Sequence, residues 1–219
     1  MSGPHQNQPL EHTGDPLHEA EAAVVLVHGR GATAKSILEM AAQFDRNRTA
    51  YLAPQAARNT WYPNSFLAPI EANEPGRSSG LEAVGNAIGE ATAEGIPTDR
   101  VVLVGFSQGA CLASEYVSRN PRQYGGLAAL SGGLIGENID PANYQGDLAD
   151  TPVFLGCSDV DPHIPEQRVH ETATVFDRLN ASVRTRIYEG MGHTVNQDEI
   201  ATVSSMIDDV LETTDSSVE

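Results

Sequence analysis

A serine lies between two glycines directly after a strongly apolar run: residues 101–104 are Val-Val-Leu-Val, and Gly-Phe-Ser-Gln-Gly follows. This order predicts a buried strand that turns abruptly into a helix, with Ser107 at the turn. Gly105 and Gly109 lack the Cβ atoms that would clash in so tight a turn. We therefore expect Ser107 to present its hydroxyl as a nucleophile. The N–H of Gln108, at the helix N-terminus, is expected to face a developing oxyanion.

The same spacing of Gly and Ser occurs at 76–80, where the central serine is Ser78. The residues before this second copy, Asn-Glu-Pro, are typical of a turn and not of a strand. We expect Ser78 or Ser79 to cap the N-terminus of the next helix. The context of the motif, and not the motif alone, selects Ser107.

A serine hydroxyl is a weak nucleophile near neutral pH, so it needs a general base and a carboxylate that orients this base. The base is expected at His193, which follows Gly-Met-Gly in the loop after a predicted strand at 184–188. His163 lies beside the expected acid rather than across from Ser107, which makes it the weaker candidate.

Two candidate acids, Asp159 and Asp161, follow a predicted strand at 153–156. Asp161 precedes Pro162, which biases it toward an extended conformation. We favour Asp161 as the orienting acid and expect Asp159 to brace the turn.

A second oxyanion donor is expected in the loop after the apolar run 22–27, where His28-Gly-Arg-Gly follows. The glycines allow the backbone to approach closely, and the N–H of Arg30 is the expected donor. We expect the Arg30 side chain to lie at the surface, so that only its backbone contributes. His28 is interpreted as a structural hydrogen-bonding residue.

Apolar runs alternate with helix-period segments along the whole chain, which predicts a parallel sheet covered on both faces. Parallel sheets place functional residues in the loops after the carboxyl ends of their strands. The expected strands are 22–27, 49–52, 101–106, 126–130, 153–156 and 184–188. The expected helices are 34–44, 80–94, 107–119, 165–179 and 197–211.

The 219 residues suit a single α/β domain at 21–212, with an arm or loose tail at 1–20 and a frayed end at 213–219. The first 20 residues lack the apolar region of a signal peptide, and no run approaches a membrane span, so we expect a cytoplasmic protein. The two cysteines are too few and too isolated for a disulfide framework or a zinc site, and Cys111 is expected in the core. We expect no metal and no cofactor.

The formal net charge is −17, and the basic residues are twelve Arg and a single Lys. Nucleic-acid binding needs a basic face, so a nucleic-acid partner is disfavoured. Acids that are dispersed along the chain, with almost no Lys, favour adaptation to high salt, where self-repulsion is screened.

Five ordered motifs give the chain a clear resemblance to the phospholipase/carboxylesterase family, which includes acyl-protein thioesterases and small carboxylesterases. They extend over about 22–211 and begin at His28, Gly95, Gly105, Asp161 and Gly190. The resemblance implies an α/β-hydrolase fold with a mostly parallel sheet of about six or seven strands. It also implies a Ser107–Asp161–His193 triad and oxyanion N–H groups on Arg30 and Gln108.

The adjacent Trp61 and Tyr62 resemble an aromatic pair in the acyl-binding region of that family, although the segment around them is shortened. The shortened segment favours a serine hydrolase that acts on small carboxylic esters. We expect the protein to be a monomer or a homodimer. The alternatives are a thioesterase or lysophospholipase for longer acyl groups, a dienelactone-hydrolase-like enzyme, and a non-catalytic ligand-binding relative.

Overall fold

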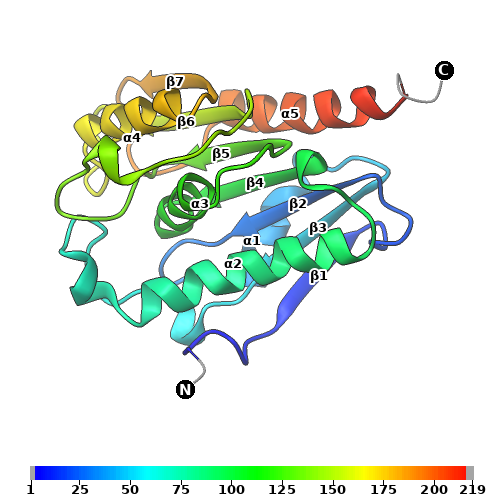
Figure 1. Ribbon diagram of the computed structural model, residues 1–219, viewed down its shortest axis with the longest axis horizontal. Coiled ribbons are helices and arrows are strands. Elements are labelled where there is room, and N and C mark those ends of the chain that lie inside the picture. The colour runs from blue at the N-terminus through cyan, green and yellow to red at the C-terminus, as the bar shows by residue number, and fades with distance from the viewer. Residues whose placement is uncertain (1–2, 216–219) are drawn as a thin grey trace.

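The computed structural model describes residues 3–215. Within these residues one seven-stranded sheet has the order β1-β3-β2-β4-β5-β6-β7, and helices cover both of its faces (Figure 1). The strands are β1 (Leu10–Gly14), β2 (Ala22–Val27), β3 (Thr49–Pro54), β4 (Val101–Phe106), β5 (Gly126–Leu130), β6 (Pro152–Ser158) and β7 (Ser182–Tyr188). The helices are α1 (Ala34–Ala41), α2 (Gly76–Ala93), α3 (Gln108–Arg119), α4 (Glu166–Arg178) and α5 (Gln197–Asp215).

The central strands are apolar on both faces because both faces are covered. Every residue of β2 is buried, and its side chains alternate between two cores. Val25 packs in the core beneath α2, α3 and α4, whereas Val24 packs in the core beneath α1 and α5. The pairs from β2 to β7 are all parallel, so their carboxyl ends meet at one edge of the sheet.

Strand β1 is the one element of the sheet that the sequence pattern does not predict. It pairs antiparallel with β3, Leu10 opposite Pro54, at the edge of the sheet. Its residues are only partly buried or exposed, so it lacks the apolar alternation of a core strand. The preceding segment is docked as well: His5 is buried, and its Nε2 lies 2.9 Å from the carbonyl oxygen of Trp61. The segment around His5 and strand β1 is thus packed against the rest of the domain.

The start of α2 differs from the expected capping. The helix begins at Gly76 after Pro75, and both serines lie inside it, so neither is its N-cap. The Ser78 hydroxyl donates to the carboxylate of Glu74, while the Ser79 hydroxyl donates to the side chain of Gln6. At the other end of the chain, α5 continues to Asp215, so the backbone at 213–215 is helical; residues 216–219 of the expected frayed end lie outside the described residues.

Candidate active site

The turn from β4 to α3 holds Ser107 in the strained backbone conformation that the motif predicts. Ser107 has φ 56° and ψ −120°, a region that non-glycine residues rarely occupy. A Cβ on Gly105 would collide with the start of α3, and one on Gly109 would collide with the carbonyl of Val27. The glycines are therefore required by close backbone approach, and the elbow holds the serine hydroxyl at the carboxyl edge of the sheet.

His193 lies between the serine and an acid, as the order of the loops predicts. Its Nε2 is 2.8 Å from Oγ of Ser107, and its Nδ1 is 2.7 Å from Oδ2 of Asp161. A proton on Nδ1 suits both contacts, because Nδ1–H then donates to a carboxylate that only accepts, and Nε2 is free to accept from the serine hydroxyl. The structure thus brings together the three residues singled out in the sequence.

The Asp161 carboxylate is fully buried and strongly hydrogen-bonded. Besides His193, the N–H groups of His163 and Ile164 donate to its Oδ1, at 2.8 and 3.1 Å. Burial alone would raise the pKa of Asp161, but the hydrogen bonds from His193, His163 and Ile164 outweigh it and hold the pKa below its ordinary value. Asp161 therefore stays ionised and can stabilise a protonated His193.

The loop that carries His193 is braced by the loop that carries the acid. Gly190 and Gly192 both have positive φ, which favours glycine at these positions. The Gly190 N–H donates to Oδ1 of Asp159 at 2.8 Å, and the Gly192 N–H donates to Oγ of Ser158 at 3.0 Å. Asp159 thus braces the turn, as expected, and does not contact the histidine.

The remaining histidines of this edge have other roles. The ring of His163 lies edge-on to that of His193 with centroids 4.9 Å apart, and within residues 3–215 no hydrogen bond joins it to Ser107. His28 is buried, and its Nε2 accepts the Ala56 N–H at 3.1 Å. Burial lowers the pKa of His28, which suits a neutral structural residue.

The backbone amides of Arg30 and Gln108 lie on the loop after β2 and at the first position of α3. Neither N–H donates to another protein atom within residues 3–215. The amide of Gln108 is free because the first N–H groups of a helix have no partner within it. Both residues line the same cavity as Ser107 and His193. Two amides beside the serine, unpaired among the described residues, are thus available to donate to an oxyanion.

A cavity of about 530 Å³ opens beside the serine. Tyr62, Phe66, Cys111 and Ile164 line it together with the elements of the triad. Burial raises the pKa of the Cys111 thiol to about 12, so it remains protonated and does not compete as a nucleophile. Trp61, expected to bind substrate, is instead a fully buried core residue whose Nε1 donates to the carbonyl of His28 at 2.8 Å.

Two side chains of the oxyanion region make contacts that sequence reasoning missed. Arg30 was expected to contribute only its backbone, but its guanidinium donates to the carbonyls of three consecutive residues, 62–64. The side chain of Gln108 forms hydrogen bonds with the same segment. No local sequence pattern indicates hydrogen bonds between residues that lie more than 30 positions apart.

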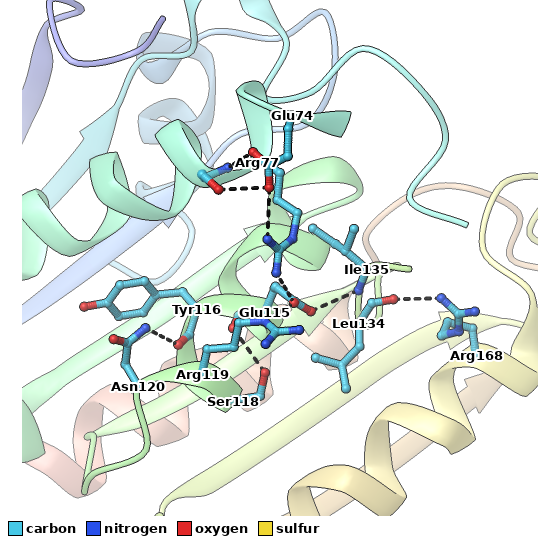
Figure 2. A network of polar contacts seen from close by, with 11 residues as sticks. Glu74, Arg77, Glu115, Tyr116, Ser118, Arg119, Asn120, Leu134, Ile135 and Arg168 are labelled. Carbon is cyan, nitrogen blue, oxygen red and sulfur yellow. Dashed lines mark hydrogen bonds and ion pairs between the residues drawn. The ribbon is translucent and has the colours of Figure 1, made fainter. Parts of the chain in front are cut away.

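A buried ion-pair network supports the helix that follows Ser107 (Figure 2). Its centre is Glu115 of α3, which is fully buried. The partners of its carboxylate are Arg77 of α2 at 2.6 Å, Arg119 of α3, and the N–H of Ile135 at 3.1 Å. Separating these partners would leave the Glu115 charge buried and unpaired, which costs much free energy. The bonds therefore hold α2, α3 and the loop after β5 in place relative to one another. Gly136 follows Ile135 in this loop, and its N–H donates to the carbonyl of Phe66. Phe66 lines the cavity beside Ser107, so the network is connected to the cavity wall.

The chain is similar to curated proteins over part of its length. The acyl-protein thioesterase 1 of Debaryomyces hansenii is 32% identical over 118 residues, or 53% of this chain and 50% of that protein. The acyl-protein thioesterase 1 of Saccharomyces cerevisiae is 29% identical over 135 residues, or 60% and 59%. The chain thus matches about half to three fifths of the length of these relatives.

Solved structures match over nearly the whole chain. The crystal structure of a phospholipase/carboxylesterase from Dyadobacter fermentans has 43% identity and a TM-score of 0.87, covering 92% of this chain and 96% of that one. The Bacillus cereus carboxylesterase, at 18% identity and a TM-score of 0.74 over 94% and 95%, shares the fold. The predicted α/β-hydrolase fold is confirmed. The family model described as phospholipase/carboxylesterase matches residues 10–211, so this chain belongs to the phospholipase/carboxylesterase family of hydrolases.

Proposed function

We propose that the protein hydrolyses small carboxylic esters through a Ser107–His193–Asp161 triad and an acyl-enzyme. The observation that carries this proposal is the continuous chain of two short hydrogen bonds, 2.8 Å from Ser107 to His193 and 2.7 Å from His193 to Asp161. A binding protein has no need of an activated serine, so this geometry favours an enzyme.

In the first half of the reaction, Oγ of Ser107 attacks the ester carbonyl carbon while Nε2 of His193 takes the hydroxyl proton. The ionised Asp161 stabilises the imidazolium that forms. The carbonyl oxygen becomes an oxyanion, which accepts hydrogen bonds from the N–H groups of Arg30 and Gln108. The intermediate collapses, the C–O bond to the alcohol breaks, and His193 returns its proton to the leaving alkoxide.

In the second half, water replaces the alcohol. His193 removes a proton from water, and the hydroxide attacks the acyl carbon of the ester to Ser107. A second oxyanion forms in the same hole. Its collapse releases the carboxylic acid and returns the proton from His193 to Oγ. The cycle needs only the side chains and amides already described, together with substrate and water.

We expect a short acyl group, because the segment around Trp61 and Tyr62 is shortened. The apolar wall of the cavity is formed by Tyr62 and Phe66 on one segment and by Ile164 on another, and all three are buried in the fold. We expect p-nitrophenyl acetate or butyrate to have a higher kcat/KM than the palmitate ester. A steady rise in kcat/KM up to acyl chains of twelve to sixteen carbons would instead support the long-acyl alternative.

A second candidate function is thioester hydrolysis, because yeast relatives bear the name acyl-protein thioesterase 1. The triad would attack a thioester by the same steps. Matched oxygen and sulfur esters of one short acyl group separate the two: the proposal predicts a higher kcat/KM for the oxygen ester after correction for the intrinsic reactivity of each leaving group.

The direct test is labelling with a fluorophosphonate probe, which reacts only with an activated serine. We expect wild type and Ser78→Ala to be labelled, and Ser107→Ala to be neither labelled nor active. Ser78 is a matched control because it occupies the same place in the second Gly-x-Ser-x-Gly copy. An unlabelled wild type would support the non-catalytic relative, and labelling that survives Ser107→Ala would move the nucleophile elsewhere.

A further inference from the structure

The guanidinium of Arg30 is bonded to one short stretch of backbone. Nη2 donates to the carbonyl oxygens of Tyr62 and Asn64, at 2.9 and 2.7 Å, and Nη1 donates to that of Pro63 at 3.0 Å. Three consecutive carbonyls that converge on one point make an acceptor cluster, which an arginine with several fixed donors fills well. Three of the five guanidinium N–H groups, including both on Nη2, are therefore already used by the protein.

The side chain of Gln108 bonds to the same stretch from the other side. Its Oε1 accepts the Trp61 N–H, and its Nε2 donates to the Tyr62 carbonyl, each at 2.9 Å. The Tyr62 carbonyl is thus shared by Arg30 and Gln108. The two residues whose amides face the oxyanion are joined through a single oxygen atom of a third loop.

The loop of Arg30 is closed by a local turn, in which the carbonyl of Gly29 accepts the Ala32 N–H at 3.2 Å and lies 2.8 Å from Nδ1 of His28. Glycines flank Arg30 on both sides, and Gly31 has φ +80°, so no neighbouring side chain restricts the backbone at this point. The Gly31 N–H donates to the carbonyl of Asn59 at 2.7 Å, which is again a contact with the third loop. The bonds to residues 59–64 therefore act together with the local turn in orienting the Arg30 amide.

We propose that Arg30 is a positioning residue: its guanidinium clamps the carbonyls of residues 62–64 and so orients its own amide, opposite that of Gln108, toward the oxyanion. This inference rests on the proposed function, because it concerns the same reaction. The competing role is direct binding of a negatively charged substrate. A misplaced oxyanion donor stabilises the transition state less and hardly changes substrate binding, so its loss lowers kcat. Loss of a group that binds the substrate would instead raise KM.

The test compares Arg30→Ala with wild type on a neutral ester, p-nitrophenyl acetate, and an anionic one, p-nitrophenyl hemisuccinate. We expect kcat to fall about 10- to 100-fold on both, up to the scale of a lost oxyanion donor, with little change in KM. Millimolar guanidinium should restore part of kcat in the variant and leave wild type unchanged. Arg58→Ala is the matched control, because Arg58 is an exposed arginine without a side-chain hydrogen bond among the described residues.

Hydrogen exchange of a peptide covering residues 59–66 gives a readout that needs no turnover. Exchange should be faster in Arg30→Ala and in Arg30→Leu than in wild type and Arg58→Ala. An unchanged kcat, a loss confined to the anionic ester, or unchanged exchange would each overturn the inference. An inactive, unlabelled wild type would be the separate failure of the proposed function, and the exchange experiment would still decide whether Arg30 clamps this segment.

Discussion

The two halves of the proposed active site are held in different ways. The base half, His193 and Asp161, lies on loops after the paired strands β6 and β7, where Ser158 is opposite Tyr188. The oxyanion half joins the loop after β2 to the start of α3 through residues 59–64, which follow β3. Neighbouring strands position the first half, whereas side chains that cross between loops position the second. The base half is therefore part of the sheet architecture, and the oxyanion half is an addition to it.

The largest expected effect comes from the base half. Asp161→Asn should lower kcat by about 10⁴-fold, because the amide cannot hold His193 in the required tautomer. Steady-state kinetics on p-nitrophenyl acetate measure this loss.

Asp159→Asn is the matched control for this substitution. Asp159 contacts the Gly190 N–H through one oxygen, which an asparagine side chain can still offer, so its loss should be far smaller. The reverse ranking would assign the role of the acid to Asp159.

This contrast explains how much of the site could be predicted from the sequence. The elbow around Ser107 is predictable because glycine spacing and an apolar run are local signals. Asp161 and His193 are predictable because both follow strands in a known order. The side-chain bonds of Arg30 are not, since their partners lie 32 to 34 residues away and only the folded chain brings them together.

The same reasoning applies to the fold. The buried strands were placed within a few residues, because covered parallel strands are continuously apolar. Strand β1 was missed because an edge strand needs no such pattern. Trp61 was interpreted as a binding residue because sequence alone does not tell a buried aromatic ring from one that lines a cavity.

A double-mutant cycle tests whether the oxyanion half is one unit. Gln108→Glu keeps the acceptor for the Trp61 N–H but replaces the donor to the Tyr62 carbonyl by a second oxygen. We expect Arg30→Leu and Gln108→Glu each to lower kcat about 10-fold or more, with the double variant little worse than either, because contacts within one network do not add. Independent, additive losses would show that the two side chains act separately.

The base half contains a second buried carboxylate, Glu199 near the start of α5. Its Oε2 accepts the Asn196 N–H at 2.9 Å, and its Oε1 has no partner among the described residues. Burial raises the pKa of Glu199 to about 7, from an ordinary value of 4.5. The folded state thus holds a proton that the unfolded state releases between these two values, so this residue makes stability fall as pH rises from about 4.5 to 7.

Glu199→Gln should remove this pH dependence. The measurement is the difference in melting temperature between the variant and wild type across pH 4.5 to 7, in which the titration of all other groups cancels. The difference should grow in favour of the variant as pH rises and become constant above about pH 7. A difference that does not vary with pH would show that Glu199 does not titrate in this range.

The smallest expected effect is that of salt, which acts on the charged surface and not on either half of the site. With a formal charge of −17, the acidic side chains repel one another. At 0.1 M salt the Debye length is about 10 Å, so repulsion between neighbouring charges is hardly screened, and molar salt shortens that length to about 3 Å. The melting temperature should therefore rise as KCl increases from about 0.1 M to molar concentration. Buried pairs are screened much less, and the Asp161 carboxylate is inaccessible, so kcat per folded molecule should stay constant. A melting temperature that is flat or falls would contradict salt adaptation and leave the triad untouched, whereas a constant melting temperature with a changing kcat would place the salt effect in the site itself.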